Sequence, residues 1–406
     1  MGDEGRFKRM NIREAKEEIR RTVEIYLDKE DGIYSIPLMK QRPVFLIGAP
    51  GIGKTAVVGQ VARELGIGFV SYSMTHHTRQ SAIGLPYIEE RDYGNGKVRI
   101  SEYTLSEIVA SVYDAVKNGE KEGILFLDEI NCVSETLFPA LLQFLQYKSF
   151  GNHRLPEGWV IVTAGNPPRY NRFVRDFDIA VLDRLKPIKV EESLDAWKPY
   201  AGESLIHGSI LAFLELEPTC FYRISAEAEG PRYVTARGWE DLSLTLKLYE
   251  KKGFGVDREL LGQYIADPEI AGKFEIFYRL YGECREKYPV EEILSGKTGG
   301  EVISRAKAAP FDERLAVLEL ICDRLSADLK GDMEPEAAGE RLESAFHFVE
   351  EAWGQGQEIS FFMTHLTMGK DTALFIARHG SPSYAKYSEK LMLSDRREKL
   401  REEILY

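Results

Sequence analysis

In three short stretches, an apolar run is followed directly by residues that can bind phosphate, bind a metal ion or activate water. The first is GAPGIGKT, residues 48–55, which follows VFLI and precedes a helical pattern. Its glycines let the backbone wrap a phosphate with N–H groups pointing inward, assisted by the helix N-terminus. Lys54 would neutralise the β- and γ-phosphates, and the Thr55 hydroxyl would hold Mg²⁺. The predicted nucleotide-binding residues of this stretch are Gly48, Ala49, Pro50, Gly51, Ile52, Gly53, Lys54, Thr55 and Ala56.

The second stretch, ILFLDEIN at residues 124–131, ends an apolar run with a pair of acids. Sheets of α/β proteins bind ligands at the carboxyl ends of their strands, where this pair falls. Asp128 would bind Mg²⁺ through water and would share the ion with Thr55, whereas Glu129 would orient and deprotonate the attacking water. Two solvated acids at a strand end are the alternative, but the upstream phosphate-binding pattern argues against them. We therefore predict a Mg²⁺ site and a catalytic base here.

The third stretch, VIVTAGNPP at residues 160–168, ends an apolar run with the amide of Asn166. An asparagine before proline is, on its own, usually a turn residue. As the third member of an ordered series, Asn166 could instead hydrogen-bond both the γ-phosphate and the water held by Glu129. We include it among the catalytic candidates for that reason.

The elements that must position these residues alternate between strands and helices from Pro43 to Val190. Most of the apolar residues in the β-rich runs are consecutive, which suits parallel strands covered on both faces. The fold class is therefore α/β, with a sheet layered between helices. Residues 86–103 interrupt this alternation and predict a β-hairpin whose turn is Gly94-Asn95-Gly96. The predicted strands are 44–47, 68–73, 124–128, 160–165 and 187–190, and the predicted helices are 56–65, 105–116 and 136–146.

Helical periodicity dominates the rest of the chain. Apolar residues at helical spacing predict a lead-in helix at 11–28, and further helices at 236–253, 311–329 and 337–353. Residues 292–302, EILSGKTGGEV, predict a linker before the last two helices. The expected domains are an N-terminal helical lead-in (1–40), an α/β core (41–190), an all-helical lid (191–285) and a C-terminal helical region (286–406).

Composition limits the classes of function. The 406 residues include 65 acidic and 53 basic side chains, for a formal net charge of −12, which works against nucleic acid as the main ligand. The four cysteines form no CxxC pair, so we expect reduced thiols rather than a disulfide framework or zinc site. The charged N-terminus has no apolar core of a signal peptide, and no run approaches the length of a membrane span. We expect a cytoplasmic protein without a membrane segment.

The order of the motifs resembles that of an AAA+ ATPase. The phosphate loop, LDEIN, AGNPP and VLDRL follow one another as they do in that class. The hairpin insertion is similar to the helix-2 insert of the MoxR branch, and VLDRL and RLPEGWVIVTAGNPP are similar to that branch's LDRF and LPE…NP motifs. The resemblance covers about residues 43–240. It implies a P-loop NTPase core with three α/β/α layers and a parallel sheet.

The resemblance also implies a role for each motif residue. Lys54 and Thr55 match the Walker A positions, Asp128 and Glu129 match Walker B, and Asn166 matches sensor 1. It further implies ATP as the nucleotide and Mg²⁺ as its metal.

Arginines complete the set of catalytic candidates. Arg184 ends the apolar, helix-like run FDIAVLDRL, where its neighbour Asp183 points elsewhere on a helix, and it matches the arginine finger of the family. Arg175 is close enough in sequence to share or contest that role. For sensor 2 we choose Arg237 in TARGWE, and Arg232 in GPRY competes with it.

Two further groups of residues, arginines in a loop and a pair of histidines, are given no functional role. Arg169 and Arg172 lie beside Arg175 in a loop that solvation and nearby aspartates would explain equally well. His76 and His77 would point apart on a strand and have no third ligand at metal spacing, so we predict no metal site there.

The function implied by the resemblance is a Mg²⁺-dependent ATPase that works as a hexameric ring and remodels or assembles a protein partner. Relatives of this branch often act with a separate protein that carries a von Willebrand factor A domain. The alternative is an AAA+ motor acting on nucleic acid, which the acidic balance disfavours. A non-hydrolysing nucleotide-binding scaffold is a weaker hypothesis, because the Lys54, Asp128, Glu129 and Asn166 set is intact. A small-molecule kinase is weaker still, because a kinase needs neither a sensor asparagine nor a remote arginine finger.

Overall fold

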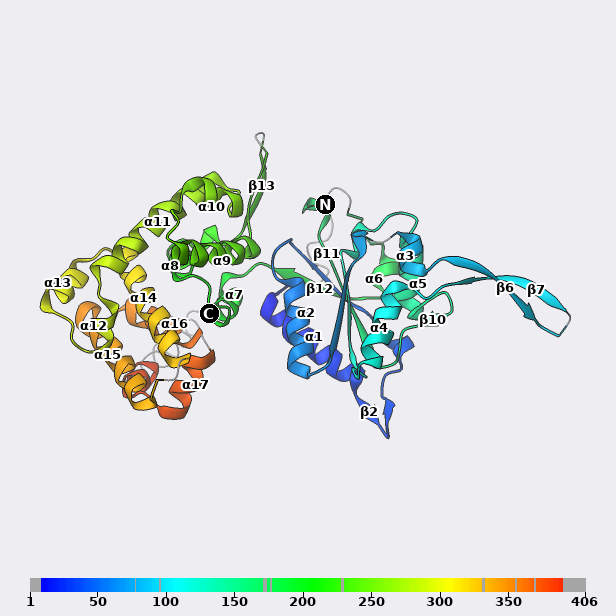
Figure 1. Ribbon diagram of the computed structural model, residues 1–406, viewed down its shortest axis with the longest axis horizontal. Helices are drawn as coiled ribbons and strands as arrows, with labels where there is room; N and C mark the ends of the chain where they lie inside the picture. Colours follow the sequence, from blue (N-terminus) through cyan, green and yellow to red (C-terminus); the bar gives the residue numbers. More distant parts are fainter. Residues whose placement is uncertain are drawn as a thin grey trace, which may run out of the picture. The chain divides into compact units, whose positions relative to one another are not determined.

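The computed structural model describes residues 9–389 except 77, 95, 171–173, 176, 228–229, 331–332, 355 and 369. The chain divides into two compact units, residues 1–193 and 194–406 (Figure 1). The first contains a parallel sheet with helices, and the second is mainly helical.

In the described part of the first unit, six parallel strands form the central sheet. Their spatial order is β1 (Arg9–Asn11), β12 (Lys186–Glu191), β4 (Val44–Gly48), β11 (Trp159–Gly165), β8 (Gly123–Asp128) and β5 (Gly68–Ser73). The inner strands β4, β8 and β11 are apolar on successive residues because both of their faces are covered. The predicted α/β/α core is therefore confirmed.

Helices cover both faces of this sheet (Figure 1). One face packs against α1 and α2, and the other packs against α4 and α5. A capping box between Asn11 and Glu14 starts α1, and Gly66, in the left-handed region, ends α2. The helices of this unit are α1 (Ile12–Leu27), α2 (Lys54–Leu65), α3 (Arg79–Ile83), α4 (Glu107–Lys117), α5 (Phe138–Tyr147) and α6 (Ile179–Leu182).

The strand register brings the carboxyl ends of the inner strands to one edge of the sheet. Ser73 at the end of β5 pairs with Asp128 at the end of β8. Gly165 at the end of β11 pairs with Ile47, one residue before the end of β4. The residues that follow these four strands therefore meet at a common edge.

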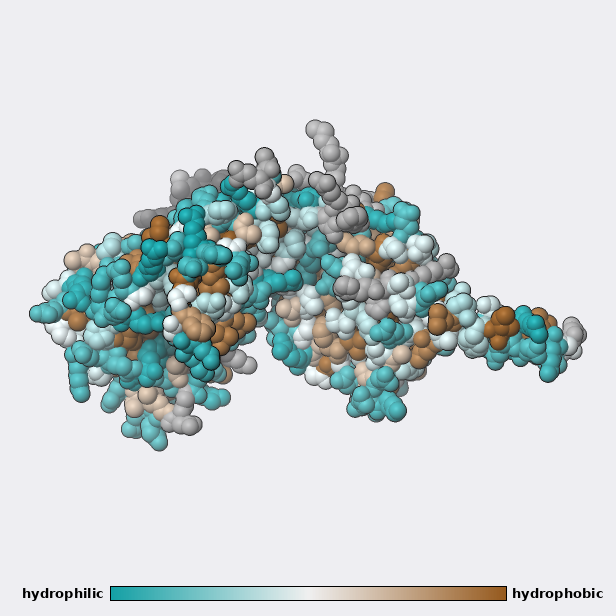
Figure 2. Space-filling view, turned by 45° about the horizontal axis from the view of Figure 1, so that its top comes forward, coloured by the Kyte–Doolittle hydropathy of each residue, from teal (hydrophilic) through white to brown (hydrophobic). Residues whose placement is uncertain are grey.

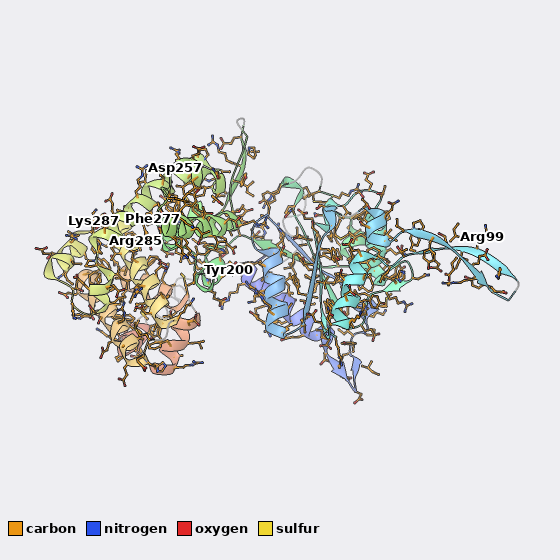
Figure 3. The ribbon with its side chains drawn as sticks, in the orientation of Figure 1. Arg99, Tyr200, Asp257, Phe277, Arg285 and Lys287 are labelled. Atoms are coloured by element: carbon orange, nitrogen blue, oxygen red, sulfur yellow. The ribbon has the colours of Figure 1, made fainter. Side chains whose placement is uncertain are left out.

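The predicted hairpin at 86–103 is confirmed as β6 (Pro86–Asp92) and β7 (Lys97–Tyr103), which extends away from the body of the first unit (Figure 1). Its surface mixes charge with exposed apolar side chains, which colour parts of it brown in Figure 2. Ile88 is 74% exposed, and Arg99, labelled in Figure 3, lies 3.3 Å from Glu90. The other short strand pairs of this unit are β2 (Lys29–Glu30) with β3 (Ile33–Tyr34) and β9 (Ser149–Phe150) with β10 (His153–Arg154).

The second unit has one hydrophobic core that runs from Trp197 to Tyr387. Its long helix α11 carries Phe277 and Arg285, labelled in Figure 3, with Phe277 buried in that core and Arg285 paired with Glu250. Within the described ranges, none of the helices combines the length and apolar character that a membrane crossing requires. The helices are α7 (Leu194–Glu203), α8 (Gly208–Leu216), α9 (Ala236–Lys252), α10 (Arg258–Tyr264), α11 (Pro268–Lys287), α12 (Val290–Leu294), α13 (Gly300–Ala308), α14 (Phe311–Lys330), α15 (Pro335–Trp353), α16 (Gln357–Met368) and α17 (Lys370–His379).

Two features of this unit differ from our expectations. A hairpin that we did not predict, β13 (Arg223–Glu227) and β14 (Gly230–Val234), lies between α8 and α9 in the chain. The linker predicted at 292–302 is wrong, because α12 and α13 occupy most of it and pack on α15. Ile293 and Leu294 are buried in the core, and their burial outweighs the Gly, Ser and Lys composition of the segment.

A buried ionisable cluster joins three helices of the second unit. His365 on α16 lies 2.5 Å from Glu319 on α14 and 4.0 Å from Glu215 on α8. Burial lowers the pKa of His365, but the combined effect of the two carboxylates is larger and raises this pKa to about 9. Burial and the nearby Glu319 carboxylate raise the pKa of Asp323 to about 7. Both groups therefore hold protons more tightly in the folded unit than in the unfolded chain.

We expect the second unit to lose stability as the pH rises from about 6 to about 9.5. His365 sets this window, because its folded pKa of about 9 lies above the ordinary 6.5, so its bound proton stabilises the fold until the pH passes that value. Asp323, whose pKa rises from 3.8 to about 7, adds a loss that is largely complete by about pH 7. For His365 alone the loss is on the order of 3 kcal/mol. Urea titrations at several pH values, followed by tryptophan fluorescence, would measure it. His365→Gln should flatten the slope above about pH 7. A free energy of unfolding that stays level or rises over this range would contradict the prediction.

Candidate functional site

The phosphate loop joins the end of β4 to the start of α2. Gly51 and Gly53 have left-handed φ angles of 74° and 90°, which glycine adopts without strain. Gly48 has no room for a side chain, because a β-carbon there would lie 2.7 Å from the Val190 carbonyl oxygen. The loop therefore needs glycine for its conformation at Gly51 and Gly53 and for close packing at Gly48. Helix α2 begins at Lys54, so its free N–H groups face this loop.

Lys54 is buried at the head of α2, with only 8% of its surface exposed. Its Nζ donates to the carbonyl oxygens of Gly48 and Ala49, both at 2.8 Å, and to Oδ1 of Asn166 at 2.9 Å. A buried ammonium group needs such partners. The structure thus brings the loop lysine together with the asparagine that follows β11.

Thr55 and Asp128 also meet across the edge of the sheet. The Thr55 hydroxyl donates to Oδ2 of Asp128 at 2.8 Å, and Oδ1 of Asp128 accepts the backbone N–H of Glu129 at 2.9 Å. A hydroxyl and a carboxylate are the hard oxygen ligands that Mg²⁺ takes alongside substrate phosphates and water. The residues present therefore fit a nucleotide-bound Mg²⁺.

Glu129 lies in the left-handed region with φ 56°, an uncommon conformation for a residue with a side chain. Its Oε2 accepts hydrogen bonds from the hydroxyls of Ser73 at 3.2 Å and Thr75 at 3.0 Å. Burial and the Glu129 and Asp128 carboxylates raise the pKa of the nearby Cys132 thiol, which keeps it protonated. Glu129 is therefore held by its backbone conformation and by two hydroxyl donors beside β5.

Three residues of this site were not predicted from the sequence: Ser73, Thr75 and Asn131. Asn131 donates from Nδ2 to the carbonyl oxygen of Asn166 at 2.8 Å. Ser73 pairs with Asp128 in the register of β5 and β8, so the order of the strands would have pointed to it. Asn131 is part of the stretch ILFLDEIN, but nothing in the sequence pattern indicated a role for it.

Arg184 follows α6 and is exposed. Its Nη1 donates to the Ala180 carbonyl oxygen within the same short segment, while Asp183 lies 3.7 Å from Arg42. Among the residues that the structure describes, Arg184 has no carboxylate within ion-pair distance. It lines a pocket with Leu142 and other residues of α5.

The neighbouring arginines have local partners. The Arg175 guanidinium lies 2.8 Å from Oε1 of Glu135 and packs over the Phe138 ring at 5.6 Å. Arg169 packs over the ring of Tyr170 at 4.6 Å. Arg172, His77 and the side chain of His76 lie outside the described residues.

The sensor 2 candidates belong to the second unit. Arg237 is exposed in the first turn of α9, which Thr235 caps. Arg232 lies on β14, 3.2 Å from Glu227. The choice between the two arginines stays a prediction.

Comparison with known proteins bears on the first unit. Residues 43–185 match the family model of the AAA domain, dynein-related subfamily. This segment runs from the start of β4 to just beyond Arg184, so it contains the phosphate loop, the acid pair and Asn166. No curated protein matches the chain. The match supports an AAA+ ATPase, and thus a nucleotide-binding P-loop domain, in this part of the chain.

Proposed function

We propose that the chain is a Mg²⁺-dependent ATP hydrolase of the MoxR-like AAA+ class, which acts in the cytoplasm as an oligomeric ring and remodels or assembles a protein partner. One observation carries the ATPase part of the proposal: polar groups from three strand ends converge. Lys54 contacts Asn166 at 2.9 Å, and Thr55 contacts Asp128 at 2.8 Å. Glu129 follows Asp128 at the same edge of the sheet.

Each of these residues has a defined task in ATP hydrolysis. The loop N–H groups and the Lys54 ammonium bind the β- and γ-phosphates and offset their charge. Thr55 and Asp128 would hold Mg²⁺, which would neutralise charge on the phosphate oxygens. Glu129 accepts a proton from the attacking water, and the Asn166 amide orients that water and the γ-phosphate.

The ring would supply an arginine to each site. A positive group stabilises the charge that develops on the transferred phosphoryl group. We assign this role to Arg184 of the adjacent subunit, because it is exposed and has no carboxylate within ion-pair distance among the described residues. Arg175 would first have to leave Glu135 at 2.8 Å. A head-to-tail ring, hexameric by family resemblance, would place one finger in every site.

The protein partner is inferred from the hairpin surface and from the family resemblance. The β6–β7 hairpin extends from the core and exposes apolar side chains such as Ile88 and Val98, which suits contact with another protein (Figure 2). The family resemblance suggests that this partner carries a von Willebrand factor A domain.

The test is the rate of ATP hydrolysis per subunit, measured over a range of protein concentrations with Mg²⁺ or with excess chelator. The rate should rise with concentration as rings assemble, and it should vanish when Mg²⁺ is removed. A catalytically dead nucleotide binder would show no turnover at any concentration. A rate that is independent of concentration down to concentrations where the protein is monomeric would overturn the shared site.

A further inference from the structure

Asn131 lies at the centre of the described site although the proposed chemistry assigns it no task. It belongs to the short helical turn η3 (Ile130–Cys132), two residues after Glu129, and is only 4% exposed. A buried amide has to be hydrogen-bonded or it costs stability. Its Nδ2 donates to the backbone carbonyl oxygen of Asn166 at 2.8 Å. The amide thus connects the turn that carries Glu129 to the residue that contacts Lys54.

The orientation of this amide is fixed by its surroundings. Turning it over would place Oδ1 against the Asn166 carbonyl oxygen, two acceptors facing each other. The amide also lies directly on Gly165, where a β-carbon would come within 2.4 Å of Oδ1 and 2.7 Å of Cγ. The close fit therefore requires a glycine immediately before Asn166.

The backbone of Asn131 makes a second connection. Its carbonyl oxygen accepts the N–H of Arg175 at 2.9 Å. Arg175 lies in the segment that leads from Asn166 to α6 and so to Arg184. Further along this segment, the Phe177 ring packs against Phe45 at 5.1 Å. Asn131 is thus bonded to Asn166 and to Arg175, which lies midway in sequence between Asn166 and the proposed finger Arg184.

We infer that Asn131 is a positioning residue for ATP hydrolysis, which fixes the Asn166 backbone relative to Glu129 and holds the backbone of Arg175. This inference rests on the proposed function. Asn131 is assigned no contact with substrate, because it is only 4% exposed and its Nδ2 is engaged with Asn166, while its buried Oδ1 has no hydrogen-bond partner among the described residues. Asn131 would keep the distance between Glu129 and Asn166 fixed. Displacements of about 1 Å at such sites cost up to about 10²-fold in rate.

The first test is Asn131→Asp, which keeps the shape of the side chain and replaces the donor with a carboxylate oxygen. We expect kcat at about pH 8 to fall by about tenfold to a hundredfold, while the Kd for a fluorescent ATP analogue stays within about threefold. A carboxyl buried against a carbonyl oxygen has a raised pKa, so lowering the pH to about 6 should protonate it and restore part of kcat. Wild-type protein, and the control Asn118→Asp at an exposed helix end, should show no such recovery.

The second test displaces the Asn131 amide and leaves its chemistry intact. Gly165→Ala would push a β-carbon into Asn131, and we expect the same fall in kcat without recovery at low pH. The matched control is Gly59→Ala on α2, where a β-carbon meets its nearest neighbour, the Phe69 ring, at an ordinary 3.5 Å. Thermal midpoints of all variants would identify any loss of folded protein.

The outcomes separate this inference from the proposed function. An active wild type with an unaffected Asn131→Asp variant overturns the role of Asn131 alone. A fall in kcat that tracks the loss of folded protein, with no recovery at low pH, also overturns it, because Asn131 would then be only structural. An inactive wild-type ring that still binds the ATP analogue overturns both proposals.

Discussion

Replacing Arg184 with alanine should reduce ATP hydrolysis per subunit by about 10³–10⁵-fold, the range over which an arginine finger accelerates phosphoryl transfer. The affinity for ATP should change by no more than about threefold, because the charge is needed chiefly in the transition state. Arg184 makes no ion pair among the described residues, and its guanidinium donates to the carbonyl oxygen of Ala180 in the same short segment. Its removal should therefore leave the fold of its own subunit intact.

The measurement is steady-state turnover at a protein concentration where rings are assembled, with nucleotide affinity determined separately. Arg175→Ala is the matched control, since Arg175 lies in the same segment but pairs with Glu135. We expect a much smaller effect there. If Arg175→Ala abolishes turnover and Arg184→Ala does not, the finger has been assigned to the wrong arginine.

The strands of the core were predictable because a strand that is buried on both faces has apolar residues at successive positions. Residues 124–128 and 160–165 are apolar almost throughout, and β8 and β11 begin only one residue earlier than expected. Hairpin β13–β14 had no such signal, since most of its residues are only partly buried or exposed. Hydrophobic periodicity indicates which residues are buried, so it does not reveal a pair of strands that faces solvent.

The contacts within the site depended on long-range register that no local pattern contains. Lys54 and Asn166 are far apart in sequence and touch only because β4 and β11 are neighbours. The hydroxyls of Ser73 and Thr75 reach Glu129 for the same kind of reason, since β5 lies beside β8. Motif order predicted which residues to consider, whereas strand order decided which of them meet.

Changing Glu129 to glutamine should lower turnover by about 10²–10⁴-fold, the usual contribution of a positioned general base. Glutamine keeps the length of the side chain, and its amide oxygen can still accept from Ser73 and Thr75. ATP binding and ring assembly should therefore persist. Glu135→Gln is the control, because it makes the same charge change nearby on a side chain that is 87% exposed. Its turnover should stay close to that of the wild type.

The two inactive variants should complement each other when mixed. An Arg184→Ala subunit keeps an intact Glu129, and a Glu129→Gln neighbour can supply Arg184 to it across the interface. Random assortment in a head-to-tail ring makes about a quarter of the interfaces wholly intact, so an equal mixture should regain a measurable part of the wild-type rate. If the finger acted within its own subunit, every site in the mixture would lack one group and no activity would return. Recovery on mixing therefore distinguishes a shared site from one completed by a single chain.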